Sequence, residues 1–281
     1  MPKRKPIVPM KYPHGPEYAY RKILLNLNRQ YKVILKKQMS PHVVSMATEA
    51  TAVNLPTGEV RQDALGWQDT LNNVMRKIAE DMTTPTNNAI KQMLRIGPQI
   101  NQANKDQWRR LIRSQYGVDV IKEDPTRFNA LLANWSRNNS LLIKDIPSKT
   151  SSQIAEQTRT ALIEGTNLKD LTKEIFDIMS ERTDVSDSRA KLIARDQTAK
   201  LNGQLTQERQ QDIGVESYVW RTMGDERVRD THDDNDGETF AWDNPPVETG
   251  HPGEDYQCRC WAEPVLPEFV AYEASLLEEA A

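Results

Sequence analysis

Apolar residues recur at three- and four-residue steps along most of the chain, the spacing that places them on one face of a helix. The pattern predicts helices over about 17–50, 63–95, 104–115, 124–143 and 148–164. Pro41 and Pro85 are expected to interrupt the first two, and Gly97-Pro98 to end the second. Residues 168–180 and about 187–211 are predicted as two further helices forming a hairpin, because Ser186 or Asp187 can cap the second.

The pattern changes beyond Gly214. Segments rich in Val, Tyr and Trp at about 215–223, 238–242 and 260–265 predict three short strands. The expected fold is therefore α+β and predominantly α-helical, with long N-terminal helices followed by a small C-terminal α+β domain. We expect an extended basic Pro-rich arm over 1–16, a helical region over 17–184, the α+β domain over 185–266 and an acidic tail over 267–281.

The 281 residues have a mean hydropathy of −0.71, which limits the core available per residue. Charge is divided unevenly, with 16 acidic residues against three arginines from Asp225 onward and a basic segment before it. The first fifty residues hold ten Lys or Arg, among them Lys3, Arg4, Lys5 and Lys11, which suit a phosphate backbone or an acidic protein surface as well as a solvated face. No apolar run approaches the roughly 18 residues of a membrane span.

Residues able to bind a metal are concentrated near the C-terminus. His232, His251, Cys258 and Cys260 together offer two nitrogens and two sulfurs, the ligand set of a tetrahedral structural zinc site. Two cysteines separated by one residue cannot easily close an unstrained disulfide. The alternative to a zinc site is an ordinary reduced pair that packs as small buried hydrophobes.

The same region contains two other patterns that could hold a metal ion. Residues 232–237 imitate a calcium loop, but a histidine stands at the first ligand position, so an acidic turn ending in Gly237 is favoured. A divalent ion held by His232 with Asp230, Asp234 or Asp236 would instead give a metal-dependent nuclease or hydrolase acting on nucleic acid, the alternative function. The chain has no phosphate-binding P-loop and no G-x-S-x-G nucleophile motif, and no catalytic residue is expected.

Four arginines lie in or beside this region and are expected to brace it by pairing with Asp225 and Asp230. Trp220 is expected in the core of the small domain. The arginines are Arg195, Arg227, Arg229 and Arg259.

The order and spacing of these residues resemble the phage Mu protein F-like minor head proteins, also called phage head morphogenesis proteins. The likeness covers about 150–265 and is strongest over 220–264. The residues that carry it are Trp220-Arg221-Thr222, Asp225, Arg227-Val228-Arg229, His232, Gly237, Phe240, Pro252-Gly253-Glu254 and Cys258-Arg259-Cys260.

The resemblance implies a tailed-phage minor capsid protein that acts by binding, in head assembly and in DNA packaging or ejection. Its implied partners are the portal protein, the major capsid protein and packaged double-stranded DNA bound without sequence specificity. Its implied location is the virion, in the head interior or at the portal, after assembly in the host cytoplasm. His251 lies where the family pattern varies, so Asp230, water or the absence of a metal remain alternatives for the fourth ligand.

Overall fold

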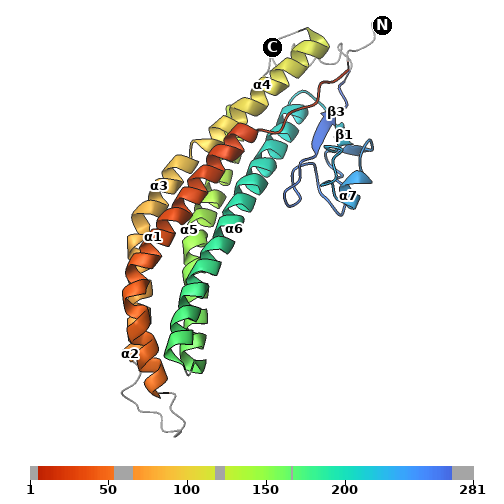
Figure 1. The fold of residues 1–281 in the computed structure, drawn as a ribbon. Helices are drawn as coiled ribbons and strands as arrows, with labels where there is room; N and C mark the ends of the chain where they lie inside the picture. The colour runs from red at the N-terminus through yellow and green to blue at the C-terminus, as the bar shows by residue number, and fades with distance from the viewer. Residues whose placement is uncertain (1–5, 54–65, 118–123, 166, 268–281) are drawn as a thin grey trace. The chain divides into compact units, whose positions relative to one another are not determined.

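A computed structural model describes residues 6–53, 66–117, 124–165 and 167–267. As predicted, the fold is α+β and predominantly helical, with a small sheet near the C-terminus (Figure 1). The elements are α1 (His14–Val53), α2 (Gly66–Asp81), α3 (Thr83–Met93), α4 (Ile96–Tyr116), α5 (Pro125–Glu164), α6 (Leu168–Gln211), β1 (Ser217–Arg221), α7 (Asp230–Asp233), β2 (Thr239–Ala241) and β3 (Trp261–Pro264).

The predicted hairpin over 168–211 is wrong, because α6 is one continuous helix. Buried positions continue without a break through its polar middle at three- and four-residue steps. The hydroxyl of Thr183 donates to the carbonyls of Met179 and Ser180, so this polar side chain is satisfied inside the helix. The residues expected to cap a new helix therefore lie within an existing one. The buried positions are Met179, Thr183, Ser186, Ala190 and Ala194.

Prolines also end fewer helices than predicted. Pro41 lies inside α1, and α5 runs through Pro147, joining two segments that were predicted as separate helices. Buried residues continue on both sides of Pro41, which is itself exposed, so packing outweighs the lost hydrogen bond. Gly97-Pro98 lies in the first turn of α4 instead of ending a helix. Proline is tolerated there because N–H groups of the first turn have no intrahelical partner, so the N–H that proline lacks costs no hydrogen bond.

The chain divides into two compact units that do not follow sequence order. The first unit comprises Met1–Tyr20, Leu94–Asn138 and Ala194–Ala281, and the second comprises Arg21–Met93 and Asn139–Ile193. The long helices α1, α5 and α6 contribute residues to both. The boundary expected between residues 184 and 185 falls inside α6.

The second unit is helical, and polar contacts join α1 to α6 within it. The amide of Asn28 donates to the carbonyl of Thr183 at 3.0 Å. Lys32 pairs with Asp184 at 3.0 Å and with Asp187 at 2.8 Å. These contacts supplement the apolar faces and fix how the two helices are aligned along their length.

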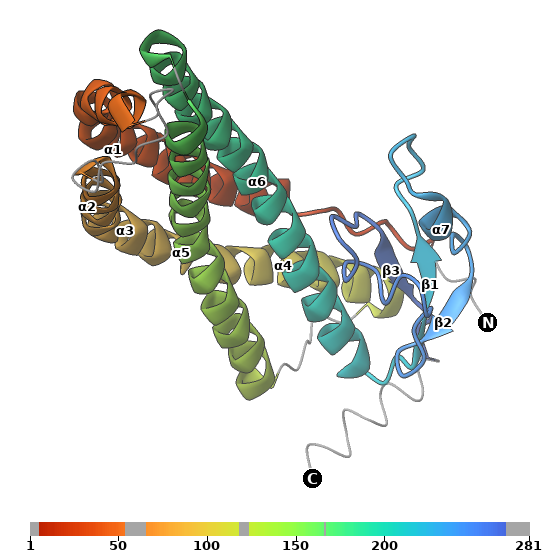
Figure 2. The same ribbon diagram turned by 90° about the horizontal axis from the view of Figure 1, so that it is seen from below.

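The first unit contains an antiparallel sheet in the order β2-β1-β3, so the three predicted strands are confirmed (Figure 2). Tyr218 of β1 pairs with Phe240 of β2, and Trp220 of β1 pairs with Ala262 of β3. One face of the sheet is buried, and Trp220 belongs to that core as predicted. Its buried residues are Tyr218, Trp220, Trp242, Cys258 and Ala262.

The N-terminal arm is part of the first unit. Residues 6–13 have no helix or strand, and Met10 is buried in a cluster with Trp108. The Gln107 side-chain amide bonds both the N–H and the C=O of Lys11. Lys3, Arg4 and Lys5 lie outside the described residues, as do residues 268–281 of the expected acidic tail. Across the described ranges, no helix combines the length and apolar character needed to cross a membrane.

Candidate metal centre

The loop that carries the cysteines packs directly against α6 in the first unit. A Cβ atom built on Gly203 of α6 would lie 2.6 Å from the carbonyl oxygen of Pro252, closer than real side chains approach. Gly253 has φ +96°, a left-handed conformation that glycine adopts most readily. The N–H of Gln257 donates to the buried Asp196 of α6 at 3.1 Å. Two glycines and one hydrogen bond thus fix the loop before β3.

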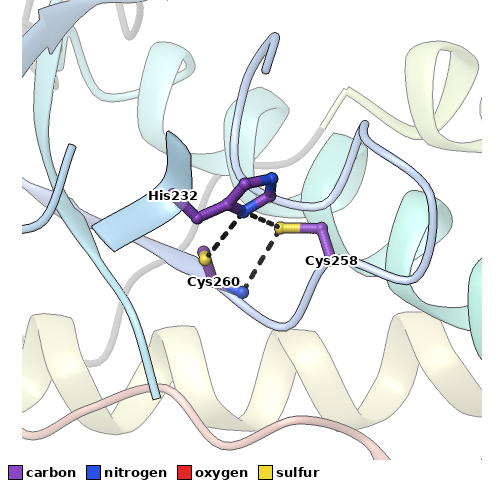
Figure 3. A group of neighbouring side chains, drawn as sticks. All are labelled: His232, Cys258 and Cys260. Carbon is purple, nitrogen blue, oxygen red and sulfur yellow. Dashed lines mark hydrogen bonds between the residues drawn. The ribbon is translucent and has the colours of Figure 1, made fainter. Parts of the chain in front are cut away.

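This packing brings three of the four predicted ligands together (Figure 3). His232 is on the short helix α7, while Cys258 and Cys260 precede β3. Nδ1 of His232 lies 3.3 Å from Sγ of Cys260 and 3.5 Å from Sγ of Cys258. One donor atom from each residue lies within 4.8 Å of the other two.

The two nitrogen–sulfur distances fit a tetrahedral ion. With Zn–S about 2.3 Å and Zn–N about 2.0–2.1 Å, a tetrahedral site places its nitrogen and sulfur ligands about 3.6 Å apart. The two nitrogen–sulfur distances of 3.3 and 3.5 Å are close to that value. A set of two thiolates and one imidazole also favours zinc over calcium or magnesium, which prefer oxygen ligands.

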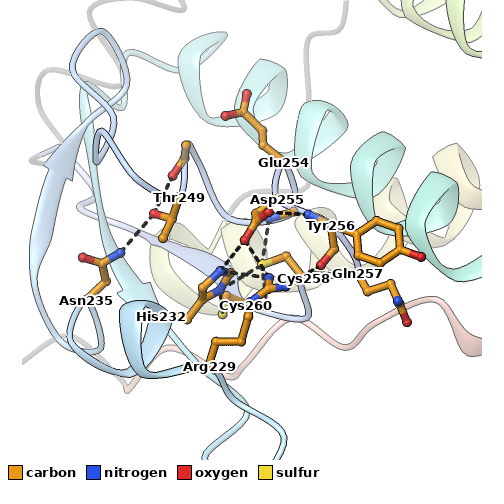
Figure 4. Close-up of polar contacts among 12 residues, drawn as sticks. Arg229, His232, Asn235, Thr249, Glu254, Asp255, Tyr256, Gln257, Cys258 and Cys260 are labelled. Carbon is orange, nitrogen blue, oxygen red and sulfur yellow. Dashed lines mark hydrogen bonds and ion pairs between the residues drawn. The ribbon is translucent and has the colours of Figure 1, made fainter. Parts of the chain in front are cut away.

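His232 is oriented so that Nδ1 faces the sulfurs. Its Nε2 lies 2.9 Å from Oδ2 of Asp255, and the same oxygen pairs with Arg229 at 2.8 Å (Figure 4). Arg229 also donates to the carbonyl of Tyr256 at 2.9 Å. Nη2 of Arg229 also lies 3.0 Å from Nε2 of His232. When the Nε2–H of a neutral ring donates to the Asp255 carboxylate, the lone pair is on Nδ1, as a metal-ligating histidine requires.

The sulfur of Cys258 is prepared to carry negative charge. It accepts hydrogen bonds from the N–H groups of Gly253 and Cys260, each at 3.4 Å. A hydrogen bond from the Cys260 thiol lowers the pKa of Cys258, aided by His232 and these amides against the cost of burial. The same pairing and burial raise the pKa of Cys260. One thiolate is therefore favoured without an ion, and a bound cation would favour the second.

His251 does not join the group. Its Nδ1 is hydrogen-bonded to the Tyr218 hydroxyl at 2.9 Å, and its ring packs against Trp242 with centroids 4.8 Å apart. Burial lowers the pKa of His251, which favours the neutral ring. His251 is thus a polar member of the small-domain core.

The four arginines have two kinds of surroundings. Arg259 pairs with Asp225 through both carboxylate oxygens, as expected, and this contact lowers the pKa of Asp225. Arg229 pairs with Asp255 and not with Asp230. Arg195 and Arg227 line a pocket beside the cysteines and make no ion pair within the described ranges.

The acidic segment over 230–237 forms α7 and the turn that follows it, and not a ligand cluster. Asp236 accepts the N–H of Thr222 at 2.7 Å, and Gly237 closes the turn with φ +84° and an N–H bond to the Trp220 carbonyl. In the part of the chain that the structure describes, the one group of three His, Cys or acidic side chains that could hold an ion is His232, Cys258 and Cys260. Asp230, Asp234 and Asp236 are not in it.

Three residues that shape the site were not predicted from the sequence. Asp255 orients His232, while Gly203 and Gly253 allow the loop to approach α6. Asp255 is one of many acids in an acidic segment, and Gly203 lies in a helical pattern that gives no sign of a close contact. The sequence signal that could have identified Asp255 is its short separation along the chain from Cys258.

Comparisons with known proteins cover the part of the chain that contains this site. Residues 152–263 match the family model described as Phage Mu protein F like protein, a range that contains all three donor residues. An uncharacterized protein of Haemophilus influenzae (strain ATCC 51907 / DSM 11121 / KW20 / Rd) is 31% identical over 255 residues. The alignment covers 86% of this chain and 55% of that protein, so the chain spans about half the length of that relative. No solved structure matches. Over residues 152–263, the chain is similar to the phage Mu protein F-like family.

Proposed function

We propose that the protein is a minor capsid protein of a tailed phage that associates with the portal and acts in head assembly and in DNA packaging or ejection. The observation that carries the proposal is the family match over 152–263, which includes both the cysteine loop and the sheet. The family is one of phage head morphogenesis proteins, which supports a site of action in the virion. The role requires binding surfaces and no turnover.

The proposal includes a structural zinc ion held by His232, Cys258 and Cys260. The sheet has short strands, so a cross-link between α7 and the loop before β3 would add stability that its core supplies only in part. Asp255 and Arg229 would fix the histidine, and the N–H groups of Gly253 and Cys260 would stabilise the thiolate. Water is the simplest fourth ligand.

Co-expression with the portal and major capsid proteins of the same phage is the direct test of the partner. We expect the protein to copurify with the portal and to remain in purified heads, because a minor capsid protein must be retained by assembled partners. The measurement is quantitative mass spectrometry of washed portal complexes and heads. A chain truncated after residue 151 removes the family-matched region and serves as the control.

Absence of the full-length chain from both washed portals and washed heads would contradict the proposal. Retention of the truncated control at the same level would show that the matched region is not responsible.

The nuclease alternative predicts cleavage of DNA. We expect plasmid DNA to stay supercoiled with magnesium, manganese or zinc, because Asp230, Asp234 and Asp236 do not join His232 in one ligand group within the described residues. Gel electrophoresis of nicked and linear products measures this. Metal-dependent nicking by the parent protein that disappears in His232→Ala would replace the structural role with a catalytic one.

A further inference from the structure

A pocket of about 210 Å³ adjoins the three donor residues and has four arginines among its lining residues. Arg195 comes from α6, Arg227 and Arg229 from the segment before α7, and Arg259 from between the cysteines. The remaining lining residues are neutral or belong to the donor group, and none of the ten is acidic. The four arginines come from three segments and outnumber the two cysteine sulfurs, so the pocket has a positive potential even when both cysteines are thiolates.

Two of these four arginines make ion pairs within the protein. Arg229 and Arg259 are paired with Asp255 and Asp225, so their charges are balanced within the protein. Arg195 and Arg227 have no carboxylate at ion-pair distance among the described residues. The pocket therefore has two arginines that make no ion pair among the described residues.

We propose that this pocket binds a phosphate group. A guanidinium fork donates two parallel hydrogen bonds to phosphate oxygens, and a phosphate monoester carries about two negative charges near pH 7. That charge matches the two arginines without carboxylate partners. The volume is below the roughly 300–1,000 Å³ typical of pockets that enclose a drug-sized ligand, so it suits one tetrahedral group and not a whole nucleoside. This site goes beyond the proposed role in head assembly and does not rest on it.

Titration calorimetry with inorganic phosphate tests the site at constant ionic strength, using the full chain. We expect saturable binding by the parent and about 100-fold weaker binding by the double variant Arg195→Gln/Arg227→Gln, because each substitution removes charge-assisted hydrogen bonds. Arg195→Lys/Arg227→Lys keeps the charges without the forks and should bind with intermediate affinity. Arg137→Gln, an exposed arginine of α5 outside the pocket, has the charge change of one substitution and should bind like the parent.

Two sources of the phosphate group are separated by short single-stranded oligonucleotides with a 5′-phosphate or a 5′-hydroxyl. At least ten-fold tighter binding of the phosphorylated strand would assign the site to a DNA terminus. Equal affinities, with inorganic phosphate still bound, would assign it to a free phosphate or a small phosphorylated molecule. No saturable phosphate binding by the parent, or unchanged binding by a folded Arg195→Gln/Arg227→Gln variant with parental melting, would overturn the proposal.

Discussion

Freshly purified protein is expected to carry close to one zinc ion per chain, and Cys258→Ala is expected to carry almost none. Removing one thiolate leaves two donors, too few for a stable structural zinc site. We expect the variant, and the parent treated with a strong chelator, to lose more than about 4 kcal/mol of unfolding free energy, since loss of a metal is among the largest single effects. Elemental analysis and thermal unfolding with and without chelator provide the measurements.

His251→Gln is the matched control, because it alters a buried histidine that lies outside the donor group. It should keep the zinc and lose only about 1–3 kcal/mol, the cost of disturbing the hydrogen bond with Tyr218. A parent protein with only a trace of zinc and chelator-insensitive melting would remove the metal from the proposed function. Zinc lost equally from His251→Gln would restore His251 as a ligand.

Gly203→Val is expected to destabilise the protein by about 3 kcal/mol and to weaken zinc binding at least ten-fold. The added Cβ would meet the Pro252 carbonyl oxygen at 2.6 Å, and a backbone oxygen cannot rotate away as a side chain can. The loop must therefore move away from α6, and it is the loop that presents Cys258 and Cys260. Urea denaturation followed by circular dichroism, with zinc competition against a chelating dye, measures both effects.

Gly15→Val is the corresponding control, because a Cβ at Gly15, in the first turn of α1, would meet no atom within 4 Å. Its unfolding free energy should stay within about 0.5 kcal/mol of the parent, as for an ordinary surface substitution. Parental stability and zinc affinity in Gly203→Val would contradict the packing of the loop against α6.

The spacing of apolar residues predicted whether a segment is helix or strand better than it predicted where each helix begins and ends. Periodicity identified the helices and the three strands, because the spacing of apolar residues records which face is buried. It failed at Pro41, Pro147 and residues 183–187, where residues with poor helix propensity lie inside long helices. There the packing of the flanking turns decided the outcome, and a propensity of at most about 3 kcal/mol was overcome.

The sequence by itself determined the fold class, the resemblance to a phage head protein family, and the candidate donors His232, Cys258 and Cys260. These depend on residue type and short spacing, which the chain displays directly. Only the tertiary structure decided that His251 faces Tyr218, that Asp255 orients His232, and that four arginines share one pocket. These relations join segments up to about sixty residues apart, and their distances are set by how the loop packs on α6, where two glycines leave no room for side chains.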